Sequence, residues 1–305
     1  MSDRLTGALL VAVSAAAFGS MALFGVWAQE SGTTTPALIF VRFALAAVIL
    51  IGVLRARRAR LPSFRRCLSI AVMGGVGYVG QAYCYFSALE HADASLVALL
   101  LYLFPAFVAI LAAIFLRERI GLMTALALAL ALLGTGLVVG GGSGRPIGIA
   151  LAVGAAVIYS VYITVGSVVT AELDAVVVAT VVCVAAAFTS GVVVVMLAVA
   201  GRPATFPGST RGWTSLVAIA LIGTVLAILT FFAGLRRLGP TSTSVLSTLE
   251  PVVTVALATW LLDESLSGIQ VLGGALVLAA VVWLALGHRQ SGGTELARTA
   301  DQGTG

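Results

Sequence analysis

Long apolar runs separated by short polar gaps make up almost the whole chain. Each run is about 20 residues long, the length that an α-helix needs to cross the hydrocarbon core of a bilayer. Helices satisfy their own backbone hydrogen bonds inside lipid, and runs of this length exceed those of membrane β-strands. We therefore predict an all-α integral membrane protein with ten transmembrane helices, at residues 5–27, 35–54, 67–89, 95–116, 122–139, 147–169, 175–200, 213–235, 241–262 and 268–287.

The composition agrees with this pattern. Of the 305 residues, 60% are hydrophobic and 10% are charged, whereas soluble domains have roughly 45–50% apolar and about 25% charged residues. A soluble domain, a disordered chain and a secreted disulfide scaffold are therefore excluded. Ten spans leave no room for a sizeable extramembrane domain, so the function must lie within the membrane or on short loops.

The charges indicate an orientation in the membrane rather than a nucleic-acid surface. All 17 basic residues are arginines, and most lie in the gaps between apolar runs, as topogenic charges do. With the N-terminus inside, thirteen arginines fall on inner segments and three on outer loops. We predict cytoplasmic termini. Because the chain is rich in alanine and arginine and free of lysine, we expect the cytoplasmic membrane of a bacterium.

The two halves of the chain repeat each other. A shift of 146 residues aligns a long stretch without a gap and pairs residues that are rare here, Pro105 with Pro251 and Glu118 with Glu264. Each half holds five spans, so the second half enters the membrane upside down, as in the inverted repeats of secondary transporters. We predict a first five-helix repeat at 1–140, a loop at 141–146, a second repeat at 147–287 and a disordered cytoplasmic tail at 288–305.

Two segments of the chain resemble the paired signatures of a known family. These are LFPAFVAILAAIFLRERIG at 103–121 and LEPVVTVALATWLLDESLS at 249–267, which resemble the EamA family of the drug/metabolite transporter superfamily. The resemblance extends over about residues 5–287. It implies a ten-helix inverted-repeat fold and a transporter of small metabolites, often an exporter, but it does not select a substrate.

Glu250 is the acidic residue that lies closest to the centre of a predicted span. A charge at that depth costs at least ~2.5–3.5 kcal/mol on insertion scales, so such a residue usually faces a cavity or a partner. Thr243, Ser247 and Thr254 share one helical stripe with it. Pro251 disturbs the preceding turn and leaves the Ser247 carbonyl free. We hypothesise that Glu250 binds a proton or a cationic group; the alternative is a protonated Glu250 that hydrogen-bonds a neighbouring helix.

Arg42 is the second charge within a predicted span, seven residues from its outer end. Its side chain could reach the outer headgroups by snorkelling. It could instead meet a substrate carboxylate or Glu250. The sequence leaves these alternatives open.

Aromatic and amide side chains recur on single faces of three predicted spans. Tyr78, Gln81 and Tyr85 share a face of the third span, and a shift of 141 residues places Phe18 of the first span on Tyr159 of the sixth. Tyr162 extends the stripe of the sixth span, and Tyr102 lies near Pro105. Together these residues favour a polar cavity, although ordinary helix packing would explain any one of them.

Glu118 and Glu264 lie at the ends of repeat-related helices. We expect structural roles for both, as acceptors for the exposed N–H groups that begin the next helix. Pro105 and Pro251 are expected to shape the backbone of their spans.

These features favour a secondary transporter that exports an amino acid or an amphipathic cation, with proton coupling through Glu250. An uncoupled facilitator or channel is the alternative, followed by a membrane-embedded enzyme. The expected partners are a small-molecule substrate, the lipid bilayer and protons, and we expect a monomer that binds no nucleic acid. We expect no catalytic residues, no cofactor and no metal, because the three cysteines show no ligand spacing. No Walker motif is present, so ATP coupling is not expected.

Overall fold

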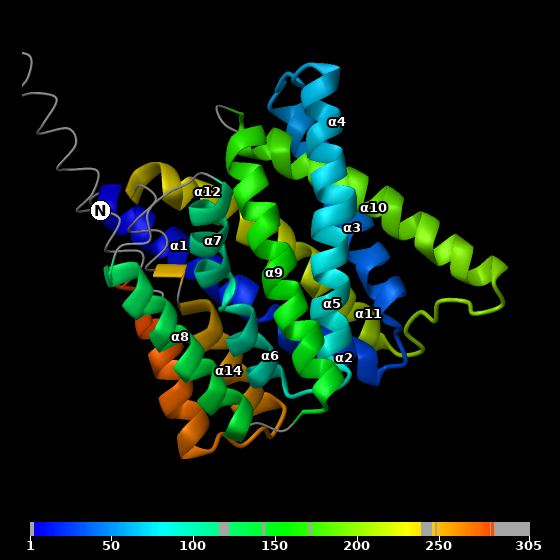
Figure 1. Cartoon of the computed structure of the whole chain (residues 1–305). Coiled ribbons are helices and arrows are strands. Elements are labelled where there is room, and N and C mark those ends of the chain that lie inside the picture. The colour runs from blue at the N-terminus through cyan, green and yellow to red at the C-terminus, as the bar shows by residue number, and fades with distance from the viewer. Residues whose placement is uncertain are drawn as a thin grey trace, which may run out of the picture.

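The computed structural model describes residues 3–115, 122–141, 144–170, 173–238, 246–247, 249–280 and 282–283, and its regular elements are helices (Figure 1). The first half contains α1 (Asp3–Gly19), α2 (Met21–Glu30), α3 (Thr35–Ala56), α4 (Phe64–Val72), α5 (Val79–Leu89), α6 (Ala94–Leu101), α7 (Phe104–Phe115) and α8 (Leu122–Gly141). The second half contains α9 (Pro146–Val169), α10 (Ala175–Val199), α11 (Thr210–Ala220), α12 (Ala227–Leu238), α14 (Leu249–Leu261) and a last helix at Gly268–Ala280.

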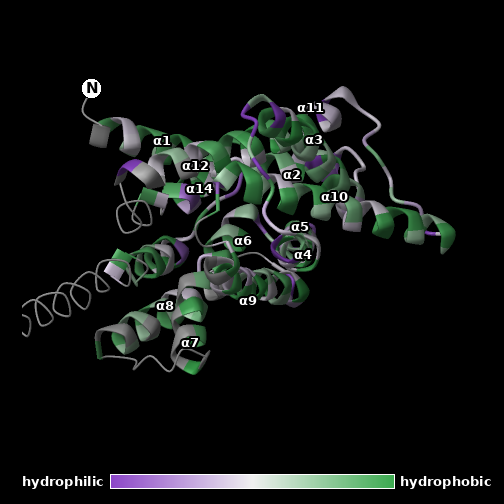
Figure 2. Ribbon diagram, turned by 90° about the horizontal axis from the view of Figure 1, so that it is seen from above, coloured by the Kyte–Doolittle hydropathy of each residue, from purple (hydrophilic) through white to green (hydrophobic). Residues whose placement is uncertain are grey.

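The helices identify a multi-pass membrane protein. Six helical stretches of the described residues are long and apolar enough to cross a bilayer, at Leu5–Glu30, Thr35–Ala56, Phe64–Leu89, Pro146–Gly166, Ala175–Val199 and Thr210–Phe231. Four further apolar helices are shorter and correspond to the predicted spans 95–116, 122–139, 241–262 and 268–287. Apolar residues predominate along most helices, and polar residues gather at loops and helix ends (Figure 2).

One predicted span is not a continuous helix, which corrects the sequence prediction. The first span runs on from α1 to α2, because the Ser20 N–H still donates to the Ala16 carbonyl oxygen (3.0 Å). The fourth span is divided between α6 and α7, where the Leu103 N–H donates to Leu100 (3.1 Å) and Pro105 follows in the first turn of α7. Proline has no N–H and is favoured at the start of a helix.

The third and eighth predicted spans each contain a π-helical segment, Met73–Tyr78 between α4 and α5 and Leu221–Leu226 between α11 and α12. The wider π turn brings one extra residue into the helix and changes the direction in which side chains project. Gly74 and Gly75 allow the first segment to pack closely on α10, because a Cβ on them would lie 2.8 Å from Val182 Cα and 2.7 Å from Thr189 Oγ1. Both segments contribute to the site described below.

Equivalent helices of the two halves pack together in opposite directions. Helix α3 lies along α10, with Leu50 near Thr180 and Phe40 near Gly191, so the chain directions oppose each other. Helix α8 lies against Gly268–Ala280 in the same way: Gly134 meets Gly273, and Gly141 lies beside Gln270.

The remaining contacts also come in equivalent pairs. Helix α1 packs against α12 and α14, and its counterpart α9 packs against α5, α6 and α7. The polar and aromatic side chains of the candidate site project into the region that these helices enclose.

Candidate substrate site

Glu250 lies in the first turn of α14, where its carboxylate meets the break between α6 and α7. The Tyr102 hydroxyl at that break lies 3.0 Å from Glu250 Oε2 and donates to the Ser247 carbonyl oxygen at 2.8 Å. Pro251 removes the N–H that would otherwise bond that carbonyl, as the sequence predicts. Glu250 is half-buried and Tyr102 is buried, so the carboxylate lies between helices and not on an outer face.

A close crossing of α14 and α1 fixes the position of Glu250. A Cβ on Gly19 would lie 2.6 Å from the Glu250 carbonyl oxygen, so only glycine permits this approach. The Thr254 hydroxyl donates to the Gly19 carbonyl oxygen at 2.9 Å, and it is 3.2 Å from that of Glu250. Thr254 therefore holds two helices together. Phe18, the residue before Gly19, is half-buried on α1.

Aromatic rings connect the Glu250 carboxylate to the opposite side of the site. The Tyr102 ring contacts Phe104 at 5.7 Å between centroids, and Phe104 contacts Tyr159 at 4.8 Å. Tyr159 stacks on Tyr162 at 6.2 Å, and Tyr162 stacks on Tyr78 at 5.4 Å. These five rings form a continuous chain of contacts, edge-on at Phe104 and stacked from Tyr159 to Tyr78, which we call the aromatic wall.

Arg42 lies at the far end of the aromatic wall. Its side chain is 1% exposed, so it does not snorkel to the headgroups. Nε donates to Thr224 Oγ1 at 2.9 Å, and Nη2 donates to the Tyr78 hydroxyl at 3.0 Å. These two partners come from the two π-helical segments. The guanidinium also lies 4.9 Å from the ring centre of Phe43 and 5.7 Å from that of Phe86, within cation–π range. No ion pair joins Arg42 to Glu250 in the described part of the chain.

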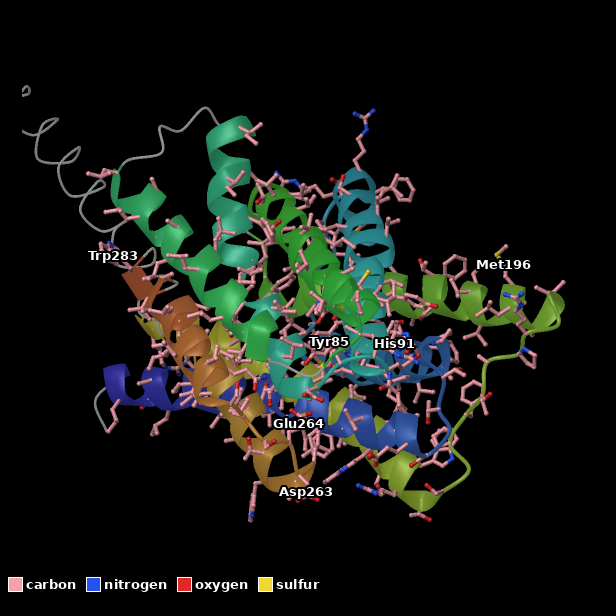
Figure 3. The ribbon with its side chains drawn as sticks, turned by 60° about the horizontal axis from the view of Figure 1, so that its bottom comes forward. Tyr85, His91, Met196, Asp263, Glu264 and Trp283 are labelled. Atoms are coloured by element: carbon pink, nitrogen blue, oxygen red, sulfur yellow. The ribbon has the colours of Figure 1, made fainter. Side chains whose placement is uncertain are left out.

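Gln81 and Tyr85 complete the polar face of α5. Tyr85 packs edge-on against Phe86 at 5.3 Å and lies within electrostatic range of both Glu250 and Arg42. Its position between the helices can be followed in Figure 3. Gln81 is 7% exposed and therefore buried on this face. The site thus offers a carboxylate, a guanidinium, an aromatic wall and a buried amide.

Glu264 caps a helix, but the capped helix is not the one that the sequence predicts. Its carboxylate accepts from the N–H groups of Ala94 (2.7 Å) and Ser95 (3.1 Å) and from the Ser95 hydroxyl (2.7 Å), at the start of α6 in the other half (Figure 3). The next helix has its own cap, because Ser267 N–H donates to Gln270 Oε1 (2.9 Å) and Gln270 N–H to Ser267 Oγ (3.2 Å). This reciprocal capping box leaves Glu264 available for α6.

Some predicted site residues cannot be placed. Thr243 and Glu118 lie outside the described residues, and for Pro105 only the backbone, in α7, is described. Pro251 is buried within α14.

Thr224 belongs to the candidate site as a hydrogen-bond partner of Arg42, and the sequence analysis did not predict it. A signal was present, because the 146-residue shift places Tyr78 on Thr224. The two hydrogen-bond partners of Arg42 are therefore equivalent residues of the two repeats. Phe104, which joins the two halves of the aromatic wall, is likewise the equivalent of Glu250.

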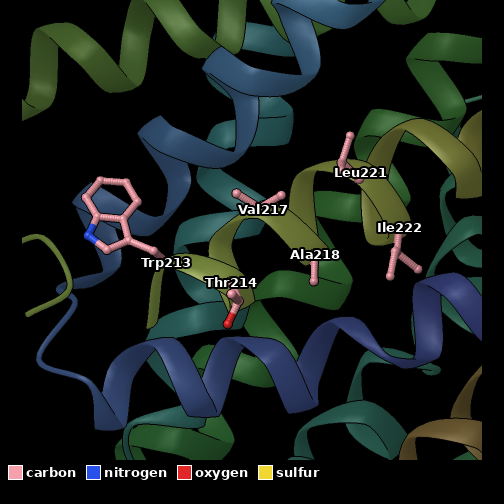
Figure 4. A pocket seen from close by; sticks show the side chains of 6 residues that line it. All are labelled: Trp213, Thr214, Val217, Ala218, Leu221 and Ile222. Atoms are coloured by element: carbon pink, nitrogen blue, oxygen red, sulfur yellow. The ribbon is translucent and has the colours of Figure 1, made fainter. Parts of the chain in front are cut away.

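A surface groove on α11 and the second π-helical segment is separate from this site. It has a volume of about 320 Å³ and is lined by Trp213, Thr214, Val217, Ala218, Leu221 and Ile222 (Figure 4). The lining is almost entirely apolar and belongs to a candidate membrane span, so this surface is suited to contact with lipid chains. The described residues hold no group of three or more side chains suited to binding a metal ion.

Comparison with known proteins gives a family and a fold. The sequence profile of the EamA-like transporter family matches residues 5–140 and again residues 146–286. No curated protein matches the chain. Among solved structures, one titled "Crystal structure of protein" superimposes with a TM-score of 0.65 at 24% sequence identity, covering 94% of this chain and 99% of that chain. At this identity the likeness shows the fold alone.

Proposed function

The chain belongs to the EamA-like transporter family, and we propose that it is a secondary transporter that exports a small metabolite across the bacterial cytoplasmic membrane. The solute is an amino acid or an amphipathic cation. The observation that carries the proposal is the Glu250 carboxylate, held between helices by Tyr102 at one end of the aromatic wall. Alternating access around this site would bring the solute from one side of the membrane to the other.

An inverted-repeat architecture of ten spans supports alternating access. Because α3 and α10 occupy equivalent places in the two halves, their opposite directions favour two copies of opposite orientation. The opposed contact of α8 with Gly268–Ala280 favours the same arrangement. We propose that both termini are cytoplasmic and that the protein acts as a monomer.

Glu250 is the proposed coupling residue. A carboxyl group at this place can bind either a proton or the ammonium group of a solute, but not both at once. Competition between the two would couple outward solute movement to inward proton movement. The Tyr102 hydroxyl and the Ser247 carbonyl provide neighbouring groups for either occupant.

The substrate is best found by a thermal-shift screen. Purified protein is incubated with a panel of amino acids and amphipathic cations, and the same panel is applied to Glu250→Gln. Compounds that raise the unfolding midpoint of the wild type but not of the variant use the Glu250 site. Glu30→Gln is the matched control, because Glu30 is exposed and pairs with Arg211 at the surface (3.6 Å).

Flux into vesicles then separates the three classes of function. A coupled transporter gives saturable flux that follows an imposed pH gradient. Flux that does not saturate and ignores the gradient would identify a channel, and product formation without flux would identify an enzyme. We expect Glu250→Gln to remove the dependence on the pH gradient and Glu30→Gln to retain it; unchanged rate and pH dependence in Glu250→Gln would refute the coupling role.

A further inference from the structure

Arg42 is a buried charge that has no charged partner among the described residues. The guanidinium is 1% exposed, and its hydrogen-bond partners are two neutral hydroxyls, those of Thr224 and Tyr78. A guanidinium has five N–H donors. Nη1 has no acceptor among the described residues, so donor capacity remains on the side chain.

Neutral groups do not neutralise this charge. The rings of Phe43, Tyr78 and Phe86 lie 4.9 to 5.7 Å from the guanidinium carbon and contribute cation–π attraction. A cation removed from water is nevertheless costly unless an anion compensates it. Charged side chains within a membrane usually pair with one another or with backbone carbonyls, and the printed partners of Arg42 are of neither kind.

Three carboxylates of the described residues have other partners. Glu250 is held by Tyr102 and forms no ion pair with Arg42 in the part of the chain that is described. Glu90 accepts from the Thr35 hydroxyl. Glu264 binds the start of α6. The described residues therefore supply no counter-charge to Arg42.

We infer that Arg42 is a binding site for a monovalent anion within the membrane, built from Arg42 on α3 with Tyr78 from the first π-helical segment and Thr224 from the second. The unused N–H groups of the guanidinium suit the two oxygens of a carboxylate or a single halide ion. Gln81 is one turn from Tyr78 on the same helix face and is 7% exposed, so its amide N–H groups could donate to the same anion. The anion is either an inorganic ion or the carboxylate of the solute; only the second source rests on the proposed function.

Chloride is the first probe, applied to the full-length protein in detergent. Sodium chloride is titrated against sodium gluconate at constant ionic strength while the thermal unfolding midpoint and the binding of radiolabelled chloride are recorded. A ligand that binds only the folded state raises the midpoint with its concentration. We expect the midpoint of the wild type to rise and saturate, with about one chloride bound per chain.

Arg42→Met separates an anion site from a merely structural arginine. Methionine retains much of the apolar volume and removes the uncompensated charge. We expect this variant to show no chloride response and to be at least as stable as the wild type in gluconate. If it is less stable in gluconate and the wild type ignores every anion, the proposal is overturned. Arg42→Lys retains the charge and should keep a weaker response, which provides a test if the methionine variant does not fold. Arg211→Met removes an exposed arginine and should leave the response unchanged.

Further arms of the experiment identify the source of the anion. Acetate and the amino acids of the screen are compared with chloride. Competition between a solute carboxylate and radiolabelled chloride would assign the site to the substrate. Chloride binding without competition would assign the site to an inorganic ion. Glu250→Gln is tested in parallel. A chloride response retained there supports the anion site even if Glu250 has no role in coupling. A response that appears only in Glu250→Gln would mean that Glu250 is the counter-ion, and it would overturn the proposal.

Discussion

Gly134→Ala tests a close backbone contact between the two halves of the molecule. A Cβ on Gly134 would lie 2.7 Å from the Gly273 carbonyl oxygen and 2.9 Å from the Val277 nitrogen, whereas ordinary contacts begin at 3.4 Å. The obstructing atoms belong to backbone and cannot rotate away. The two helices must therefore separate by several tenths of an ångström along their contact.

The expected cost follows from two opposing effects. Overpacking of a tight contact costs about 1–3 kcal/mol. Alanine in place of glycine stabilises a helix by about 0.8–1.0 kcal/mol. Gly136 of the same helix isolates the second effect, because it is exposed and a Cβ there would meet nothing within 4 Å. The difference between Gly134→Ala and Gly136→Ala is therefore the packing cost alone, about 1–3 kcal/mol.

Thermal unfolding in detergent measures this difference. At a few degrees per kcal/mol, the midpoint of Gly134→Ala should lie roughly 2–8 °C below that of Gly136→Ala. Gly273→Ala should behave like Gly134→Ala, because its Cβ would lie 2.6 Å from the Gly134 carbonyl oxygen. The double variant should lose less than the sum of the two, since one separation relieves both clashes. Equal midpoints for Gly134→Ala and Gly136→Ala would refute the contact between α8 and the last helix.

Three further substitutions test individual contacts. Tyr102→Phe removes the hydroxyl that bonds Glu250 and Ser247. Because a hydrogen bond to a charged group contributes about 1.5–3 kcal/mol, we expect vesicle flux to change by roughly 10- to 100-fold. The amount of folded protein in gel filtration should not change. Glu264→Gln should lower stability by about 1–2 kcal/mol because it weakens the cap of α6, whereas Asp263→Asn on the same loop should not; equal unfolding midpoints would contradict the cap. Thr224→Val leaves Arg42 Nε without an acceptor and should cost about 1–3 kcal/mol in the same assay, and a neutral result would mean that the Arg42–Thr224 bond is not formed.

The apolar runs are enough to predict where helices form, because a run in lipid can satisfy its backbone hydrogen bonds only by becoming helical. They could not predict the break at Tyr102. That break depends on the start of a proline-led helix, which does not change the apolar character of the run. The π-helical segments were hidden for the same reason.

The sequence predicts which residues form the candidate site, but it does not predict which of them contact each other. The stripe of Glu250 and Thr254 was read as one polar face, yet Thr254 bonds the backbone of α1 while Glu250 faces Tyr102. For Arg42 the sequence left the choice between headgroups and interior open, and the choice is decided by packing against α5 and the second π-helical segment. Its partner Thr224 could have been found from the repeat, since it is the equivalent of Tyr78.

The helix that Glu264 caps illustrates a limit of local reasoning. A carboxylate after a helix is expected to meet the next helix start. Here Ser267 and Gln270 already satisfy that start, and the free carboxylate meets α6 across the boundary of the two halves. Only the three-dimensional arrangement reveals that a second, uncapped helix end lies within reach.

Proton release on solute binding tests the central claim most directly. The solute from the thermal-shift screen that carries a positive charge is added to lightly buffered, purified protein, and the protons released are counted with a pH indicator. If Glu250 exchanges its proton for the solute, the wild type releases protons in proportion to the solute bound, and Glu250→Gln binds more weakly and releases none. Equal proton release from both proteins would contradict the assignment of Glu250 as the coupling group.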